Sequence, residues 1–320
     1  MTNKPKSPTS SISVMVTVLN EQATISRLLE ALGKQTLQPT AVIIVDGGST
    51  DGTLQILKQW QKKKLPFRLL VKQQKGNRSV GRNTALKLAT TAYVACTDAG
   101  CVPEKTWLEE LVKKQKQTKA KVVAGYYRGL AKNGFQVAQV PYVLVMPDQV
   151  DEQTFLPATR SVLFDRGWLL KIGGFDQTLS DNEDYALAKK IEAIQKRSKT
   201  PVLSFAKKAV VGWIPRDTLR QFGWMIFRFA RGDARAGIFR PKVLALFARY
   251  FIFLIWFLLA VSWQQWLLVA SFVATCLFYI FWSVQKNYRY AKQSWYWLPV
   301  LQLTCDVSVM LGTIVGLLSY

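Results

Sequence analysis

The stretch Tyr93-Val94-Ala95-Cys96-Thr97-Asp98-Ala99-Gly100-Cys101 joins an apolar run to a short acidic turn. A short apolar run that ends at turn residues is typical of a buried strand. Open α/β sheets hold their ligands in the crevice outside the carboxyl ends of the strands, so an aspartate released there is a candidate for chemistry. Asp98 can equally serve only to start a turn, which Asp and Gly favour, and this stretch alone leaves both interpretations open.

On both sides of this stretch, strand-like and helix-like segments alternate. Strands are predicted at residues 12–19, 41–45, 67–71, 93–97 and 122–126, and helices at 21–35, 51–60, 78–89 and 104–117. Such alternation with short loops predicts an α/β domain, with a mostly parallel sheet and helices on both faces, over residues 11–215. Residues 128–170 are less periodic. Residues 1–10 have no apolar run, so we expect a disordered tail rather than a signal peptide.

The composition limits the chemistry. The chain has 43 Lys and Arg against 20 Asp and Glu, a net charge of +23, and no histidine. The excess of positive charge favours anionic partners such as nucleic acid, phosphorylated substrates or an anionic membrane surface. The lack of histidine excludes a histidine base, a histidine triad and histidine metal ligands, so acid–base work falls mainly to carboxylates. The four cysteines lack paired spacing and are interpreted as buried side chains of a reduced compartment.

A second acidic segment, Ser180-Asp181-Asn182-Glu183-Asp184, precedes a helical pattern. Ser180 and Glu183 match the S-x-x-E capping box, so helix-start chemistry can account for much of this acidity. Asp184 is not needed for that box and stays available for another role.

Residues 216–242 contain a basic amphipathic helix. On a helical wheel one side carries Trp224, Phe227 and four arginines, and the opposite side is apolar. This pattern favours a helix in a membrane interface, with its arginines towards lipid phosphates, over a surface helix packed on the domain. The arginines are Arg220, Arg228, Arg231 and Arg235.

Three apolar segments follow, at about 244–261, 266–284 and 297–318 within residues 243–320. Each is near the roughly 20 residues that cross a bilayer, so three transmembrane helices are predicted. Arg249 is expected to reach the headgroups, and Asp306 is interpreted as a packing or lipid-pocket residue. The basic loop after the second segment places that loop and the N-terminal domain in the cytosol, and the C-terminus on the far side.

Several motifs in order resemble the inverting family-2 glycosyltransferases of the GT-A (Rossmann-like) fold, from about residue 11 to residue 237. They are Thr17-Val18-Leu19-Asn20-Glu21, Ile43 to Thr53 with Asp46-Gly47-Gly48, Gly81-Arg82-Asn83, the Asp98 turn, Gly173-Gly174-Phe175-Asp176 and Glu183-Asp184. The resemblance implies a nucleotide-diphosphate sugar as donor.

The resemblance also implies roles for individual residues. Asp46, helped by Asn20 and Glu21, would bind the base and ribose, although Asp46-Gly47-Gly48 can also be a tight turn. Arg78 and Arg82, one helical turn apart, would bind the diphosphate, and a solvated basic face is the alternative. These donor-binding residues include Asp98. The pair Glu183 and Asp184 would be catalytic, with Asp184 as the base for a hydroxyl acceptor.

The chain departs from the family at the opening turn. The family's usual metal site is Asp-x-Asp, and here Gly100 replaces the second acid. Mg²⁺ often uses only one or two protein carboxylates plus waters and substrate phosphates, so Asp98 alone could hold Mg²⁺ or Mn²⁺. We expect such binding to be weak without the donor.

The leading functional prediction is a membrane-bound glycosyltransferase. It would move a sugar from a cytosolic nucleotide-sugar to a lipid-linked or membrane-proximal acceptor such as polyprenyl phosphate, in cell envelope glycan or glycolipid synthesis. Arg228, Arg231 and Arg235 would contact phosphate or lipid headgroups. A processive polysaccharide synthase is disfavoured, because Gln221-Phe222-Gly223-Trp224 lacks the arginine of Gln-x-x-Arg-Trp. A membrane-tethered nucleotide-sugar-binding scaffold is the alternative without catalysis. No zinc site or RNA-binding signature supports nucleic acid as a partner.

Overall fold

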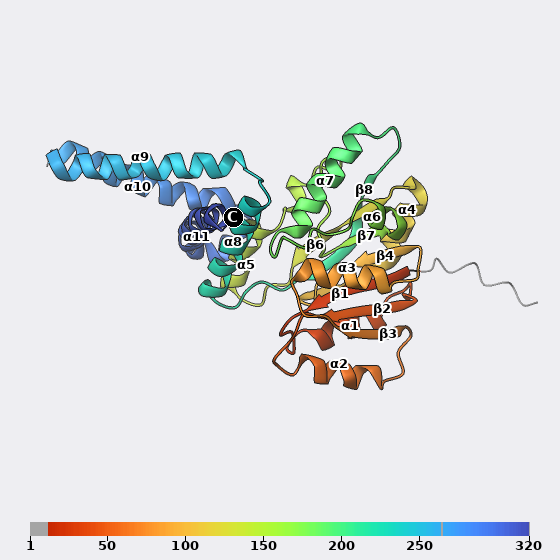
Figure 1. Cartoon of the computed structure of the whole chain (residues 1–320). Helices are drawn as coiled ribbons and strands as arrows, with labels where there is room; N and C mark the ends of the chain where they lie inside the picture. The colour runs from red at the N-terminus through yellow and green to blue at the C-terminus, as the bar shows by residue number, and fades with distance from the viewer. Residues whose placement is uncertain (1–11, 264, 320) are drawn as a thin grey trace, which may run out of the picture. The chain divides into compact units, whose positions relative to one another are not determined.

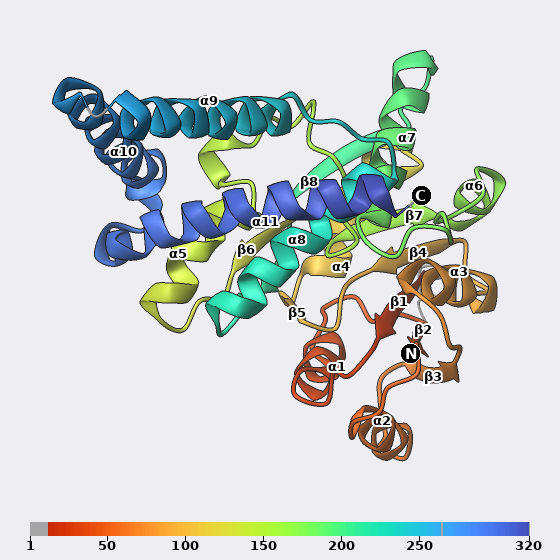
Figure 2. The same ribbon diagram turned by 60° about the vertical axis from the view of Figure 1, so that its left-hand side comes forward.

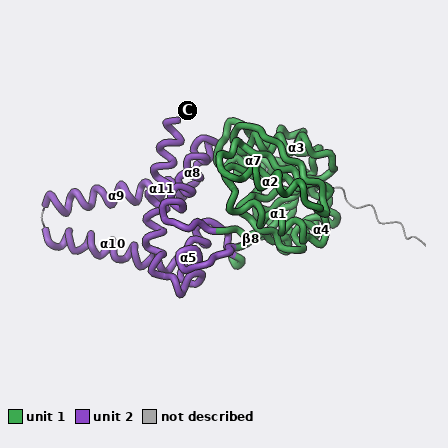
Figure 3. Tube along the Cα trace, turned by 90° about the horizontal axis from the view of Figure 1, so that it is seen from below, with its two compact units in different colours: residues 1–128, 147–214 green, residues 129–146, 215–320 purple. Residues whose placement is uncertain are grey.

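The computed structural model describes residues 12–263 and 265–319. The tail predicted at residues 1–10 lies outside the described residues. The chain divides into two compact units, Met1–Arg128 with Pro147–Ile214 and Gly129–Met146 with Pro215–Tyr320, coloured green and purple in Figure 3. The segment Gly129–Met146, which the sequence placed in the first domain, belongs to the second, helical unit.

The first unit is built on a mixed sheet that has eight strands within the described residues, in the order β3-β2-β1-β4-β7-β6-β8-β5 (Figure 1). The strands β3, β2, β1 and β4 pair in parallel. The remaining recorded pairs, β4 with β7, β6 with β7 and β5 with β8, are antiparallel. The predicted α/β class is confirmed, but only half of the sheet is parallel. The strands are β1 Ile12–Val18, β2 Ala41–Asp46, β3 Arg68–Gln73, β4 Tyr93–Cys96, β5 Cys101–Pro103, β6 Val122–Gly129, β7 Val162–Asp165 and β8 Leu203–Trp213.

Helices connect the parallel strands, because parallel neighbours need a crossover rather than a hairpin. These are α1 Ile25–Gly33, α2 Thr53–Gln61 and α3 Arg78–Leu88, followed by α4 Trp107–Thr118, the 3-10 turn η1 Pro147–Gln149, α6 Arg166–Lys171 and α7 Glu183–Arg197. The side chain of Asn77 accepts a hydrogen bond from the Val80 amide at 3.0 Å, which fixes the start of α3 at Arg78. This start aims the first turns of α3 at the carboxyl ends of the strands.

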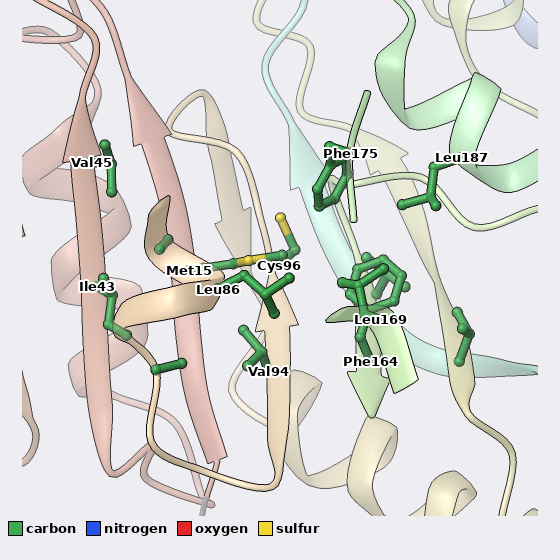
Figure 4. Close-up of a cluster of buried hydrophobic side chains, with 14 of the residues drawn as sticks. Met15, Ile43, Val45, Leu86, Val94, Cys96, Phe164, Leu169, Phe175 and Leu187 are labelled. Atoms are coloured by element: carbon green, nitrogen blue, oxygen red, sulfur yellow. The ribbon is translucent and has the colours of Figure 1, made fainter. Parts of the chain in front are cut away.

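Buried side chains cover both faces of the sheet. On one face, Met15 and Ile43 from the strands pack with Leu86 of α3 and Leu187 of α7 (Figure 4). Because side chains alternate along a strand, Val14 and Val16 point to the other face, and they too are fully buried. The helices α1 and α4 lie on the opposite side of the sheet from α3 and α7 (Figure 3). Both faces of the sheet are therefore shielded from solvent.

The capping box predicted at Ser180 is wrong. The helix α7 begins at Glu183, its N-cap residue is Asn182 in the left-handed region (φ 55°) rather than Ser180, and the Asn182 side chain makes no capping hydrogen bond. The Glu183 carboxylate instead contacts the Arg82 guanidinium. A buried cation binds this carboxylate more strongly than a backbone amide would.

The second unit is helical. It contains α5 Gly134–Val143, α8 Leu219–Arg235, α9 Pro241–Trp263, α10 Trp266–Asn287, the 3-10 turns η2 Tyr288–Tyr290 and η3 Lys292–Trp297, and α11 Leu298–Leu318. Within the described residues, three helical segments are long and apolar enough to span a membrane, namely Pro241–Trp263, Trp266–Tyr290 and Lys292–Leu318. They coincide with the three segments predicted from the sequence.

Two charged residues in these segments, Asp306 and Arg249, contact each other. Asp306 is buried and accepts hydrogen bonds from Tyr250 at 2.9 Å, from Gln302 at 2.9 Å and from the Tyr279 hydroxyl. Arg249, expected to reach the headgroups, lies 3.2 Å from the same carboxylate. A carboxylate buried among apolar helices is costly unless it is paired, and Arg249 supplies the opposite charge.

Candidate functional site

The candidate site lies at one edge of the sheet in the first unit. Parallel strands end at the same edge, and the pairs Val18 with Asp46 and Met15 with Cys96 bring the ends of β1, β2 and β4 together. The strand order reverses between β1 and β4, because β2 follows on one side of β1 and β4 lies on the other. Such a switch point opens a crevice between the two following loops. Asp98 emerges here.

Asp46 closes the turn after β2. It is fully buried and accepts hydrogen bonds from the Gly48 amide at 3.1 Å, from the Ser49 amide at 3.0 Å and from the Ser49 hydroxyl. Gly48 has φ 109°, which favours glycine. The turn interpretation of Asp46-Gly47-Gly48 therefore holds, and this turn holds the carboxylate by three hydrogen bonds.

The loop after β1 is tied to the loop after β2. The Asn20 side chain accepts a hydrogen bond from the Thr50 amide at 2.8 Å, and the Asn20 amide donates to the Ser49 hydroxyl at 2.9 Å. The Glu21 amide donates to the Thr53 hydroxyl at 2.8 Å. The loop after β1, which carries Asn20 and Glu21, is thus hydrogen-bonded to the loop that follows Asp46, and the role of these residues in donor binding stays a prediction.

Arg82 is the centre of the acidic cluster. Its side chain is 3% exposed; Nη1 contacts Glu183, and Nη2 donates to Asp98 at 3.1 Å and to the Thr159 hydroxyl at 2.9 Å. Burial alone would lower the pKa of Arg82, but the charges of Glu183 and Asp98 outweigh it and raise that pKa above its usual value. Arg82 therefore stays a cation and holds two acids of separate segments together.

This placement differs from the expected pair of arginines on the donor diphosphate. Both Nη atoms of Arg82 contact acids of the protein. Glu183 and Asp98 neutralise the buried charge of its guanidinium. Arg78, one turn earlier, has a side chain that is 44% exposed and lies 4.0 Å from Asp181. The Arg78 side chain is thus the more exposed of the two, and binding of the diphosphate by Arg78 and Arg82 stays a prediction.

The two adjacent acids have different surroundings. Glu183 is 2% exposed, and burial raises its pKa, with Arg82 opposing this and the Asp184 charge adding to it. Asp184 is partly exposed; Oδ2 accepts a hydrogen bond from Thr159 at 3.3 Å and Oδ1 one from the Tyr185 amide at 2.9 Å. Asp184 is therefore partly exposed to solvent, whereas Glu183 is buried against Arg82.

The sequence reasoning missed Thr159 and Arg160. Thr159 bridges Arg82 and Asp184 through its hydroxyl. The Arg160 guanidinium lies 5.6 Å from the centre of the Tyr127 ring and 5.7 Å from that of Trp213, and within the described residues it makes no hydrogen bond or ion pair. Both residues lie in the weakly periodic stretch, where no sequence signal marks them.

The residues at the opening turn fit a divalent cation only as part of a donor complex. The Asp98 side chain is 37% exposed, and a Cβ added at Gly100 would meet nothing within 4 Å, so open space lies where the family's second acid would stand. The described residues contain no group of three Asp, Glu, His or Cys side chains that could hold a metal. One carboxylate with donor phosphates and waters satisfies Mg²⁺ or Mn²⁺.

The predicted headgroup arginines are in the helical unit. Arg228, Arg231 and Arg235 are partly exposed along α8, and the Arg231 guanidinium lies 5.8 Å from the Phe227 ring. Trp224, on the same side of the helix, is 57% exposed and stacks on Phe227 with ring centres 5.0 Å apart. The arginines and aromatic rings therefore form one face of α8.

The mixed sheet, with acids at the switch point of its parallel half, is similar to that of solved glycosyltransferases of the GT-A type. The mannosyltransferase PcManGT of Pyrobaculum calidifontis, solved with GDP-Man and Mn²⁺, matches over 93% of this chain and 86% of its own, with a TM-score of 0.62 and 18% identity. TarS of Staphylococcus aureus matches over 69% of this chain and 39% of its own, with a TM-score of 0.51 and 21% identity. These likenesses establish the fold.

The family is given by sequence. The family model "Glycosyl transferase family 2" matches residues 13–169, so this part of the chain carries a family 2 glycosyltransferase domain. Glycosyltransferase AglE of Haloferax volcanii is 30% identical over 130 residues, which are 40% of this chain and 43% of AglE. The poly(ribitol-phosphate) β-N-acetylglucosaminyltransferase TarP of Staphylococcus aureus is 26% identical over 181 residues. The matched part of the chain spans about half the length of these curated relatives, 43% of AglE and 54% of TarP.

Proposed function

We propose that this protein is a membrane-bound inverting glycosyltransferase that moves a sugar from a nucleotide-diphosphate sugar to a lipid-linked or membrane-proximal acceptor. The observation that carries the proposal is the cluster around Arg82. It gathers Asp98, Glu183 and Asp184 from two distant segments at the switch point of the sheet. A buried ion cluster is costly to desolvate, and the positioning of acids for chemistry would account for it where the fold alone does not need it.

Asp184 is proposed as the base for a hydroxyl acceptor. The acceptor oxygen would attack the anomeric carbon and lose its proton to the Asp184 carboxylate, while the bond from that carbon to the diphosphate oxygen breaks. The nucleoside diphosphate leaves with the bonding electrons, and attack from the opposite face inverts the anomeric centre. Thr159, which donates to Asp184, would hold the carboxylate in place. An ionised phosphate acceptor would need no base.

The donor would lie along the crevice between the loops after β1 and β4. Asp46, Asn20 and Glu21 would bind the nucleoside, and the cations of Arg78 and Arg160 would bind the diphosphate. Asp98 would hold Mg²⁺ or Mn²⁺ together with the donor phosphates, and such an ion offsets negative charge on the leaving diphosphate. The nucleotide-sugar and Mn²⁺ in the mannosyltransferase complex support this class of donor and cofactor.

The helical unit supports an acceptor at the membrane. Three of its helical segments are long and apolar enough to span a bilayer. The arginine face of α8, with Arg228, Arg231 and Arg235, would bind the phosphate of a lipid such as a polyprenyl phosphate. The positive loop at Lys286, Arg289 and Lys292 supports a cytosolic catalytic unit.

The test is transfer from a panel of labelled nucleotide-sugars by membranes that contain the protein. Label is expected in the lipid extract, and label only in water-soluble product would contradict the acceptor class. Asp184→Asn is expected to lower kcat for a hydroxyl acceptor by about 10²–10⁴ with donor binding kept. Glu192→Gln, on the exposed side of the same helix, is the matched control. Donor binding without transfer by the unmodified protein would instead support a binding scaffold.

A further inference from the structure

The helices α9 and α10 form an antiparallel hairpin. The rings of Phe257 and Phe272 lie 5.7 Å apart, and those of Phe253 and Tyr279 lie 6.1 Å apart. The 23 residues of α9 extend about 35 Å, which exceeds the roughly 30 Å of a hydrocarbon core. Apolar side chains of the hairpin are exposed around it, among them Phe251, Leu254, Leu258, Leu267, Val273 and Phe278. This hairpin fits a bilayer in length and surface.

The third apolar helix, α11, does not join the hairpin as a parallel neighbour. Figure 3 shows α11 running across the direction of α9 and α10. Its polar contacts with the hairpin lie away from the turn that joins α9 to α10. There Asp306 pairs with Arg249, and Lys286 donates a hydrogen bond to Gln302 at 3.2 Å. A helix that crosses a bilayer beside this hairpin would run along it instead.

The close partner of α11 is α8 (Figure 2). A Cβ added at Gly223 would lie 3.1 Å from Thr304, one at Gly312 would lie 2.3 Å from the carbonyl oxygen of Phe227, and one at Gly316 would lie 2.7 Å from that of Arg231. The contacts advance along both helices in the same order, so α8 and α11 run in parallel. They stay in contact for about 18 Å, because a helix rises about 1.5 Å per residue.

The positive charge of α8 limits how deeply α8 and α11 can enter the bilayer. Its 17 residues include four arginines, Arg220, Arg228, Arg231 and Arg235. Each arginine costs about 2.5–3.5 kcal/mol at the centre of a spanning helix. Because α11 is packed on α8 from Thr304 to Gly316, α11 cannot cross the bilayer without taking Arg231 and Arg235 along.

We propose that only the α9–α10 hairpin crosses the membrane, and that α8 and α11 lie side by side in the interface of one leaflet. The exposed apolar face of α11 contacts the acyl chains there, and the arginine face of α8 contacts the lipid phosphates. The apolar face consists of Val300, Leu303, Val307, Leu311, Ile314 and Leu318, at helical spacing.

The position of the ion pair agrees with this arrangement. Arg249, whose side chain pairs with Asp306 of α11, lies 14 residues before Trp263 along α9. This separation corresponds to about 21 Å along the helix axis. If Trp263 and Trp266 at the end of the hairpin occupy the far interface, as tryptophans commonly do, the pair lies in the near leaflet. A charged pair near the interface is less costly than one at the centre.

Two crossings place the C-terminal end of α11 on the same side of the membrane as the chain before α8. The three spans predicted from the sequence would place it on the far side. This inference concerns topology and does not depend on the proposed function.

The experiment uses three versions of the full chain that differ only in the position of one hydrophilic peptide with a protease site. The peptide precedes Met1, follows Gln265 at the end of the hairpin, or follows Tyr320. Each version is digested in sealed membrane vesicles before and after the vesicles are opened with detergent. We expect the sites at Met1 and Tyr320 to be cut from one side, and the site at Gln265 from the other.

Cleavage of the Tyr320 site together with the Gln265 site would overturn the inference, because α11 would then cross the bilayer. Cleavage of all three sites from one side would also overturn it, because the hairpin would not cross. A chain misfolded by the peptide at Gln265 is recognised by its fluorescence melting curve in detergent. The versions with the site at Met1 and at Tyr320 still show whether the two ends of the chain are cut from the same side of the membrane or from opposite sides.

Discussion

Replacing Arg82 with methionine tests the buried cluster that organises the candidate site. The methionine keeps most of the apolar volume of the arginine stem and removes the cation, so Glu183, 2% exposed, is left as a buried charge without its partner. Removing one member of a buried ion pair costs about 3–5 kcal/mol. At about 2–4 °C per kcal/mol for a unit of this size, the melting temperature is expected to fall by about 6–20 °C.

The matched control is Arg78→Met on the same helix. Its side chain is 44% exposed and lies 4.0 Å from Asp181, so its loss is expected to cost at most about 1 kcal/mol. Melting of the full chain in detergent, followed by tryptophan fluorescence, measures both variants. If the melting temperatures of the two variants agree within about 2 °C, the Arg82 cluster does not stabilise the unit and the reasoning is refuted.

Two further measurements separate the effect of an unpaired buried charge from that of a packing defect, namely the stability of a double variant and the pH dependence of stability. Adding Glu183→Gln to Arg82→Met is expected to raise the melting temperature again, because the uncompensated charge is gone. Burial already raises the pKa of Glu183, and loss of Arg82 raises it further. A raised folded-state pKa means that stability is retained at low pH and is lost as the pH rises through that value. Arg82→Met is therefore expected to be less destabilised at pH 5 than at pH 8.

Three further changes are expected to separate the roles of other site residues. Gly100→Asp adds a second acid beside Asp98 in open space, so we expect little loss of stability and tighter Mn²⁺ binding to the donor-free protein by calorimetry. Arg160→Met removes a cation that is proposed to bind the diphosphate and is expected to raise the KM for the donor at least about tenfold, with Arg68→Met on the exposed edge strand as control. Burial raises the pKa of Cys96 to about 12, so iodoacetamide at pH 8 is expected to alkylate Cys96 only after unfolding, as measured by mass spectrometry.

Specific results would contradict each of these. Unchanged Mn²⁺ affinity in a folded Gly100→Asp chain would show that Asp98 is not at a cation position. An equal rise in KM for Arg160→Met and Arg68→Met would remove the role of Arg160 in donor binding. Rapid alkylation of Cys96 in the native protein would show that the end of β4 opens to solvent.

Much of the first unit was predictable from local pattern. The apolar run before Asp98 and the alternating segments on each side have periods that a strand or a helix imposes, so the parallel half of the sheet followed from the sequence. The antiparallel strands β7 and β8 were missed, because β7 has only four residues and the stretch before it is weakly periodic. For the same reason Thr159 and Arg160 left no signal.

The partners of charged residues were not predictable. Arg82 and Glu183 are 101 positions apart, and Arg82 and Thr159 are 77 apart. Arg249 and Asp306 are 57 apart. Contacts across such distances leave no period in the sequence, so the same residues were interpreted as a diphosphate site, a helix cap and a headgroup anchor.

The sequence by itself determined the class of the fold, the acids that follow the strands and the three apolar helices, because periodicity and hydrophobicity are local properties of the chain. Only the tertiary structure decided that Arg82 contacts both Asp98 and Glu183, that Asp184 is more exposed than Glu183, and that α11 packs along α8. Each of these depends on which distant segments are packed together and on which side chains that packing buries.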